Sequence, residues 1–515
     1  MSKADRMNAA QCSRGRKQEQ RRFRSAQEAA GLRRPSHTTR PNRTSPYQSV
    51  EQEQEARSEA VVEYARLIRA QLPTLLEKLS QIPDPRNPMM IQHTLNTLMV
   101  YGILMFVLQT GSRRKTNEKL TAPAMKSMLM ELFPDLASMP HHDTLCRLLA
   151  RIEPEGIEAA QLELVNRLIR DKKFCDYLID HHYLIAIDGT QKLVRRFLPD
   201  ERWLQRQVGA EDKKWTQYYV YVLEANLVLS NGLSIPLMSE FLDYHKGDGQ
   251  REKQDCEQRA FFRLTERLKA AFSHLSIMLL LDGLFASGPV MSRCRDYRWH
   301  FMIVLQDGSL PYLWQEYHGL KRYRTQEDRL SQRWADRQQQ FEWQNDIEYR
   351  YGRNESRQVR VHLVHCQESW QEVGPDAGVV QRSASWAWIS DLAFSKETVS
   401  SLCNLGGRHR WAIEEGFLVE KHQGYHYEHC YAQQWNSMRG YHYLMRIAHL
   451  LNVLTCFLNT LITFVKEKGA QGFIQWLRST LNGRWLQPAE IRARMCAPFQ
   501  LRLLFPQAAL SDGGP

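Results

Sequence analysis

The sequence contains ten cysteines, but none form a CxxC pair and their spacing is irregular. This pattern argues against a disulfide framework and is typical of reduced thiols in an intracellular protein. The sequence also lacks a glycine-rich loop of the GxxxxGK type, so nothing in it indicates ATP dependence. No serine or cysteine is indicated as a nucleophile. The chemistry therefore has to be sought among other side chains.

Long uninterrupted apolar runs are missing as well. The stretches Thr94–Gly111 and Tyr443–Val465 approach the length of a membrane span, but polar residues interrupt both of them, namely Asn96, Gln109, Arg446, His449, Asn452 and Asn459. We interpret the two stretches as buried helices of a large protein. The first residues hold no apolar core typical of a signal peptide. We therefore expect a cytoplasmic protein with no membrane partner.

The positive charge is concentrated at the N-terminus. The formal net charge is +12, and residues 1–50 hold 12 Lys/Arg against three Asp/Glu, a net +9 that leaves about +3 for the rest. The basic balance favours an anionic partner such as nucleic acid. Because most of it lies in one segment poor in large apolar residues, we predict a disordered basic tail over residues 1–55.

Beyond the tail the sequence predicts four further regions. Apolar residues at three- and four-residue spacing predict a helical N-terminal domain over 56–175, in which Pro140–Ala150 supplies either a DNA-contacting helix or a packing helix. Residues 176–306 and 392–450 form the expected catalytic core, interrupted by a β-rich insertion over 307–391. Residues 451–515 form a helical C-terminal part.

The core has the pattern of an α/β fold. We expect a strand over Tyr183–Ile187, a hairpin over 218–242 around Asn231-Gly232, and a helix over 251–272. Apolar strands then follow over 277–281 and 300–305, with a helix between them. A long apolar strand after a crossover helix implies at least one parallel pairing. This order matches the ribonuclease H-like fold.

Three carboxylates are candidates for metal binding. Asp188 and Asp282 each follow an apolar strand and precede a glycine, where binding groups collect at the edge of a sheet. Either aspartate could also belong to an ordinary turn. In the segment from Arg410 to Lys421, positions 410, 414 and 421 fall at roughly 0°, 40° and 20° around an α-helix. Glu414 would thus lie between two cations, unless the helix is merely a solvated one with salt bridges.

These residues resemble the DDE transposases of bacterial insertion sequences that carry a β-strand insertion and a Tyr-x2-Arg-x3-Glu-x6-Lys signature. Arg410, Glu414 and Lys421 match the last three signature positions, whereas Gly407 stands at the tyrosine position. The resemblance covers roughly residues 182–450. It implies that Asp188, Asp282 and Glu414 are catalytic and hold two Mg²⁺ or Mn²⁺ ions.

The same resemblance implies the reaction and the partners. An activated water attacks a phosphate at the end of a mobile element, and the freed 3′-hydroxyl then attacks the target strand. Arg410 and Lys421 would bind DNA phosphates. The partners would be double-stranded DNA, at the element's terminal repeats and at the target, and further copies of the chain in a homodimer or higher oligomer. A location at the bacterial nucleoid follows when the protein acts.

Several alternatives stay open. Aromatic and basic residues of the insertion could contact DNA or simply pack it, namely Trp314, Arg322, Arg324, Trp334, Trp343 and Arg350. A group formed by His422, His426, His429 and Cys430 lacks a standard zinc-finger spacing, so a polar cluster is the simpler interpretation. Two rival functions are a stand-alone nuclease, which would not transfer strands, and a non-enzymatic DNA-binding protein derived from a transposase, which would bind DNA without cutting it.

Overall fold

The computed structural model describes residues 44–246, 254–373, 379–483 and 485–503, together with positions 15, 18, 21, 22, 25 and 26. Most of the predicted basic tail therefore lies outside the described residues. Its predicted end at residue 55 is too late, because helix α2 already begins at Val50. Ser49 is the N-cap residue, and its side chain accepts the backbone N–H of Gln52. This cap starts the helix before its first buried residues, Ser58 and Ala60.

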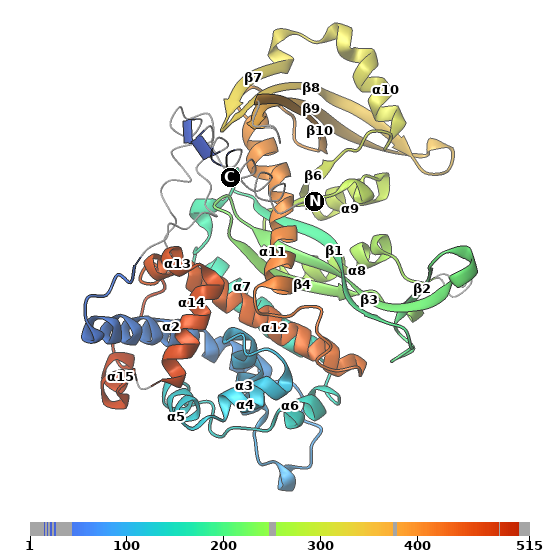
Figure 1. The fold of residues 1–515 in the computed structure, drawn as a ribbon. Coiled ribbons are helices and arrows are strands. Elements are labelled where there is room, and N and C mark those ends of the chain that lie inside the picture. The colour runs from blue at the N-terminus through green and yellow to red at the C-terminus, as the bar shows by residue number, and fades with distance from the viewer. Residues whose placement is uncertain are drawn as a thin grey trace, which may run out of the picture. The chain divides into compact units, whose positions relative to one another are not determined.

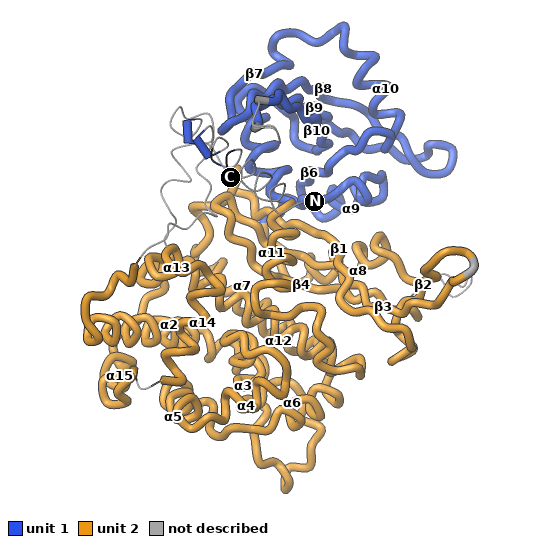
Figure 2. The backbone as a smooth tube through the Cα atoms, viewed as in Figure 1, with its two compact units in different colours: residues 1–42, 276–410, 506–515 blue, residues 43–275, 411–505 orange. Residues whose placement is uncertain are grey.

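The chain divides into two compact units, coloured separately in Figure 2. Of the described residues, unit 1 contains 276–410 and unit 2 contains 44–275 and 411–503, apart from the gaps given above. The boundaries near 275 and 410 fall inside the predicted catalytic core rather than at its ends. Hydrophobic periodicity does not predict this division, because each unit contributes strands and helices with similar apolar patterns.

Unit 2 combines a helical part with a four-stranded antiparallel sheet (Figure 1). Its helices before the sheet are α2 (Val50–Leu79), α3 (Leu95–Val107), α4 (Arg113–Leu120), α5 (Pro123–Leu132), α6 (His142–Leu149) and α7 (Glu155–Arg170). The strands and the helix that follows them are β1 (Tyr183–Arg195), β2 (Leu204–Val208), β3 (Trp215–Val228), β4 (Ser234–Phe241) and α8 (Glu257–Ala271). The C-terminal helices are α11 (Trp411–His422), α12 (Trp435–Cys456), α13 (Ile462–Lys468), α14 (Ala470–Asn482) and α15 (Pro488–Met495).

Strand β3 is central in this sheet. It pairs antiparallel with β1 along one edge and with β2 and β4 along the other. The predicted hairpin is β3 and β4, and Gly232 in its turn adopts φ +84°, the left-handed region that glycine tolerates best. Helix α12 packs against α3, α6 and α7 as well as β4. The hydrophobic core of unit 2 therefore joins the N-terminal helices to the sheet.

The helix boundaries explain the apolar stretches in the sequence. Helix α3 is 13 residues long and almost wholly buried, and α12 extends from Trp435 to Cys456, with Arg446 and His449 inside it. Helix α12 crosses the predicted domain boundary at residue 450. Within the part of the chain that the structure describes, no helix has the length and apolar character needed to cross a membrane.

Over residues 276–410, unit 1 consists of a mixed sheet and the helices α9 and α10. Its elements are β5 (Ile277–Leu281), α9 (Gly288–Tyr297), β6 (His300–Val304), α10 (Pro311–Gly319), β7 (Arg329–Trp334), β8 (Arg337–Tyr351), β9 (Arg357–Val373) and β10 (Val379–Ser390). Strands β5 and β6 are parallel with α9 between them, as the apolar strand pattern predicted. Strand β10 pairs antiparallel with β6, and β9, β8 and β7 follow in turn. The predicted insertion thus continues the sheet of β5 and β6. The mixed α/β class is confirmed.

Candidate active site

Asp188 lies within a long strand rather than at its end. The sequence predicted that the strand stops at Ile187, but β1 continues to Arg195. The reason is pairing, because each residue from Leu184 to Gln191 has a partner on β3 and the ladder resumes after a bulge at Lys192. The Asp-Gly pair therefore forms no turn here. The Asp188 side chain is half-buried, and its Oδ1 accepts the backbone N–H of Gly189 at 2.8 Å.

One face of the sheet carries a row of polar side chains across three strands. Asp188 on β1 is directly opposite Glu224 on β3, and Glu224 is directly opposite Ser239 on β4. Directly opposite residues in antiparallel strands project from the same face. Glu224 is fully buried and accepts hydrogen bonds from the Ser239 hydroxyl at 2.6 Å and from the Tyr427 hydroxyl at 3.0 Å. The face that bears Asp188 is therefore the one covered by the segment after α11.

Helix α11 carries Glu414 and packs against β1, β3 and β4. Its buried positions Ile413, Gly416, Phe417 and Glu420 recur at three- and four-residue spacing and define one face. A Cβ at position 416 would lie 3.3 Å from Nδ2 of Asn226, so glycine there permits close approach of the helix to β3. Glu414 is exposed in the first turn. Asp188 and Glu414 thus lie on elements of unit 2 that pack together.

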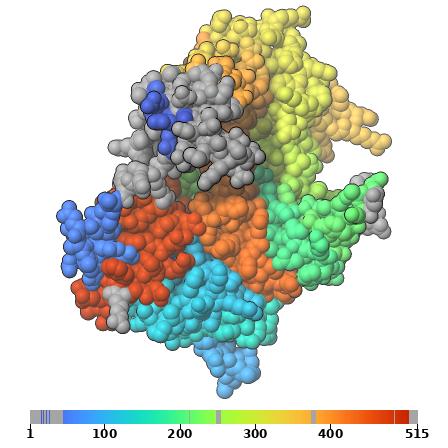
Figure 3. Space-filling model, in the orientation of Figure 1, coloured from blue at the N-terminus to red at the C-terminus, as the bar shows by residue number. Residues whose placement is uncertain are grey.

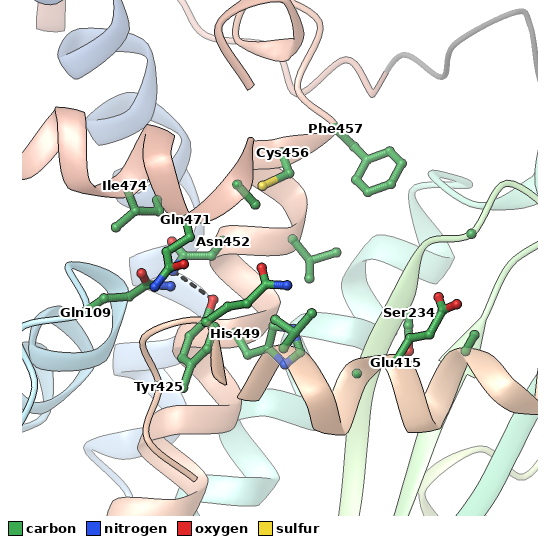
Figure 4. A pocket seen from close by; sticks show the side chains of 17 residues that line it. Gln109, Ser234, Glu415, Tyr425, His449, Asn452, Cys456, Phe457, Gln471 and Ile474 are labelled. Carbon is green, nitrogen blue, oxygen red and sulfur yellow. Dashed lines mark hydrogen bonds between the residues drawn. The ribbon is translucent and has the colours of Figure 1, made fainter. Parts of the chain in front are cut away.

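Glu415 projects elsewhere. It lines a pocket of about 200 Å³ with Ser234, Tyr425, His449 and residues of α12 and α14, as Figure 4 shows. In that pocket the Asn452 amide donates to the Tyr425 hydroxyl at 3.0 Å. Glu414 lies about 100° away around the helix. The two adjacent glutamates therefore project from different faces of α11.

A buried ionic network lies beneath this helix. Arg446 on α12 is 1% exposed and forms ion pairs with Glu224 at 3.2 Å and with Glu420 at 3.1 Å. His449 Nδ1 lies 2.6 Å from the Glu420 carboxylate. Glu224 is the cross-strand neighbour of Asp188, and Glu420 is on the same helix as Glu414. Arg446 therefore connects the strand next to Asp188 with the helix that carries Glu414.

Burial and the neighbouring charges shift the pKa values of the side chains in this network. Burial raises the pKa of Glu224 despite the attraction of Arg446. Burial would also raise the pKa of Glu420, but Arg446 and His449 hold it below the usual value. Burial lowers the pKa of Lys192 on β1 to about 8, against the pull of both glutamates. Arg446 remains charged between two acids, which is the arrangement that compensates the cost of burying a guanidinium.

Asp282 is in unit 1, after β5 as the sequence predicted. It is the N-cap of a short 3₁₀ turn, and its Oδ1 accepts the backbone N–H of Leu284 at 3.0 Å. Glycine follows because a Cβ at position 283 would lie 2.9 Å from the Gln306 side chain. The side chain of Asp282 is half-buried.

The signature helix is less regular than the sequence suggested. Residues Ser401–Gly406 form a π-helical segment and Gly407–Arg410 a 3₁₀ turn, and only Trp411–His422 is α-helical. The uniform rotation of about 100° per residue that placed Arg410 on the stripe thus holds only from Trp411 onward. Arg410 is buried and belongs to unit 1. Lys421 shares the α-helix with Glu414, and its Nζ lies 3.2 Å from a carboxylate oxygen of Glu428.

The glycine at the signature tyrosine position has a structural cause. A Cβ at Gly407 would lie 2.6 Å from Nε1 of Trp388, which is itself buried on β10. The indole occupies the space that any side chain at position 407 would need. Glycine at position 407 therefore leaves room for the indole of Trp388 on β10.

The insertion residues fall into two groups. Trp343 is buried in the sheet, and the Arg324 side chain is 1% exposed, over the Tyr317 ring and paired with Glu342. Trp314 and Trp334 are half-buried, while Arg322 and Arg350 are exposed. The packing interpretation thus holds for Trp343 and Arg324. Two exposed aromatics that the sequence analysis missed are Tyr312 and Tyr323, at 43% and 66% exposure.

The histidine group after α11 shows polar packing. The ring centroids of His429 and Tyr431 are 4.6 Å apart. The Cys430 thiol donates to the carbonyl of Ala432, with Sγ 3.4 Å from the oxygen. A group of possible metal ligands lies elsewhere among the described residues, at His141, His142 and Asp143 ahead of and at the start of α6. The remaining side chains of α6 include buried Leu145, Leu148 and Leu149, so this helix packs into unit 2.

A protein-family model matches part of the chain. Residues 76–165 match a family model described as DDE_Tnp_1-associated, which is well under half of the chain. No curated protein matches. Among solved structures, a cryo-EM structure of a piggyBac transposase synaptic complex with hairpin DNA aligns with 10% identity, over 87% of this chain and 82% of the other, at a TM-score of 0.35. That score is too low to show a shared fold. The family match relates residues 76–165, from the end of α2 into α7, to DDE-type transposases.

Proposed function

We propose that this chain is a DNA transposase of the DDE type, and that it belongs to the group of bacterial insertion-sequence transposases with the signature described above. It would cleave DNA at the ends of a mobile element and join those ends to target DNA. Asp188, Asp282 and Glu414 would be the catalytic carboxylates. A ribonuclease H-like catalytic core and action as a homodimer or higher oligomer on DNA are part of the same proposal.

The observation that carries the proposal is that Asp188 and Glu414 lie on packed elements of unit 2, in a chain whose residues 76–165 match a transposase-associated family. Asp188 is on a paired strand, and Glu414 is on a helix whose buried face is fixed to that sheet by Arg446. Side chains on rigid elements keep their geometry better than side chains on loops.

The donor chemistry fits hard divalent cations. Carboxylate oxygens are the ligands that Mg²⁺ and Mn²⁺ prefer, and Asp188, Asp282 and Glu414 would hold two such ions. When bound, the ions would activate water and stabilise the attacking and leaving oxygens of the phosphate. Lys421 would exchange its ion pair with Glu428 for a DNA phosphate, and Arg410 would contribute a second phosphate contact.

The decisive experiment compares Glu414→Gln with Glu415→Gln. Both changes remove one negative charge from α11, so Glu415→Gln is a matched control. Magnesium-dependent nicking and strand transfer should be lost in Glu414→Gln and retained in Glu415→Gln, with melting temperatures of both variants close to that of the parent. Full activity of a folded Glu414→Gln protein would contradict the site. Nicking without any strand transfer by the parent would instead support a stand-alone nuclease.

A further inference from the structure

Unit 2 has a surface cluster of basic side chains that the proposed chemistry does not use. It consists of four residues on α4, one at the end of β1 and two in the loop between α11 and α12, namely Arg113, Arg114, Lys115, Lys119, Arg195, His426 and His429. We call it the α4 basic cluster. In Figure 3 the cyan segment that contains α4 adjoins the orange segment that contains α11 and the loop after it.

Helix α4 is built to lie on the surface. Of its eight residues only Thr116 and Leu120 are buried. The Ser112 side chain caps the helix by accepting the backbone N–H of Lys115, and the Thr116 and Thr110 hydroxyls are 2.6 Å apart beneath it. Two buried positions give too little apolar area to drive folding alone. The cap and these threonines hold α4, and its Arg114 and Lys115 side chains are exposed.

The loop after α11 is joined directly to the start of α4. The Tyr431 hydroxyl donates to the carbonyl of Gly111 at 3.2 Å, and Lys119 Nζ donates to the carbonyl of Thr110 at 2.9 Å. Nε2 of His426 lies 3.9 Å from the place where a Cβ at Gly111 would stand. The cluster is therefore one continuous surface, and it begins at the end of the helix that carries Glu414 and Lys421.

Acidic neighbours are few. Asp143 lies 3.8 Å from Arg113, Glu118 is on α4 itself, and Glu428 in the loop pairs with Lys421. Among the described residues, neither Arg114 nor Lys115 has a carboxylate within ion-pair distance, and both are exposed. Burial lowers the pKa of His426, and Lys115 and Lys119 lower it further. His426 therefore lies in the positive electrostatic potential of Lys115 and Lys119.

We propose that the α4 basic cluster binds the phosphate backbone of duplex DNA and directs that duplex toward α11. The inference rests on the proposed function for the identity of the anion. The cations of α4 and β1, with the polar histidines of the loop beside them, suit a row of phosphates, and contacts to phosphates fix the position of a duplex without specifying its sequence. The proposal also gives a role to the transposase-associated segment, because α4 lies within residues 76–165.

The test measures binding of the full chain to a fluorescein-labelled 30-base-pair duplex by anisotropy, in EDTA and over a range of salt concentrations. The variant is Arg114→Ala with Lys115→Ala. The control is Lys172→Ala with Lys466→Ala, which removes two exposed cations of unit 2 outside the cluster. Each lost phosphate contact reduces the slope of log K against log salt by about 0.9. The cluster variant should lose about 1.8 from the slope, so relative to its affinity near 1 M salt it should bind on the order of 60-fold more weakly than the parent near 0.1 M salt.

A cluster variant that binds with the slope and affinity of the control variant would overturn the proposal, as would tighter binding of the parent to duplex RNA of the same sequence. Failure of the proposed function has a different signature. In that case the parent would bind duplex DNA, and the cluster variant would bind it more weakly, while the parent would not cleave DNA with magnesium. That result would support the DNA-binding surface and contradict the transposase chemistry.

Discussion

Replacing Arg446 by methionine perturbs the connection between the sheet and the signature helix. The guanidinium contacts Glu224 and Glu420 and also donates to Oδ1 of Asn226 at 2.7 Å. Methionine has a similar length but no charge, so two buried carboxylates would lose their common cation. Removing one partner of a buried ion pair typically costs about 3–5 kcal/mol. At about 2–4 °C for each kcal/mol, the melting temperature of unit 2 should fall on the order of 10 °C.

The matched control is Arg478→Met. Arg478 on α14 is half-buried and donates to the carbonyls of Leu108 and Gln109 at 3.2 and 2.7 Å. Because those acceptors are neutral, its loss should cost only about 1–3 kcal/mol. Calorimetry or urea unfolding of the full chain at pH 7.5 measures both variants. A loss below about 1 kcal/mol for Arg446→Met would refute the reasoning.

Two further measurements show whether charge is the cause. Adding Glu420→Gln to Arg446→Met removes one uncompensated acid, so the double variant should be more stable than the sum of the single effects predicts, by about 0.5–3 kcal/mol. Without Arg446, the largest influence that lowers the pKa of Glu224 and of Glu420 is gone, so burial raises both values. A raised folded-state pKa of an acid makes stability fall as pH rises above about 4.5, so Arg446→Met should be less destabilised at pH 5 than at pH 8. Additive effects with no pH dependence would mean that packing explains the loss.

Three other predictions follow from the described residues. Asp282→Asn should leave metal-free DNA binding unchanged and abolish magnesium-dependent cleavage, because a neutral amide is a poor ligand for a hard dication; near-parental nicking would remove this residue from the site. Deletion of residues 1–50, which carry a net +9, should weaken DNA binding at low salt and flatten its salt dependence, while an unchanged slope would show that the segment does not touch DNA. The hydrogen bond from His300 to Asp391 raises the pKa of His300, so this pair should contribute stability below about pH 6.5 that is lost as pH rises through the folded-state pKa; His300→Gln should remove that pH dependence from unfolding curves, and a parental curve would contradict the assignment.

Local patterns in the sequence predicted many of the elements well. The Asn231-Gly232 turn requires positive φ, and the apolar run before Asp282 fits only a buried strand, so both were apparent without coordinates. Arg446 and His449 inside an apolar stretch indicated a buried helix rather than a membrane span. These features depend on neighbours within a few residues, and such short-range preferences are visible in sequence.

The predictions that were wrong depended on partners far along the chain. Strand β1 runs through Asp188-Gly189 because β3 supplies a hydrogen-bonding partner at each step, which overrides the turn preference of the dipeptide. Gly407 is explained only by Trp388, and the 3₁₀ turn before Trp411 is not visible in a pattern that assumes uniform helical rotation.

The sequence by itself determined the candidate carboxylates, the α/β class and the basic N-terminal segment, because residue type and local spacing are enough for each. Only the tertiary structure decided that Glu224, Glu420 and Arg446 meet in one buried network, and that α4 and the loop after α11 form one basic surface. Contacts between residues hundreds of positions apart form only when packing of the whole unit compensates the entropy of closing such long loops, and a single sequence does not show which of them will form.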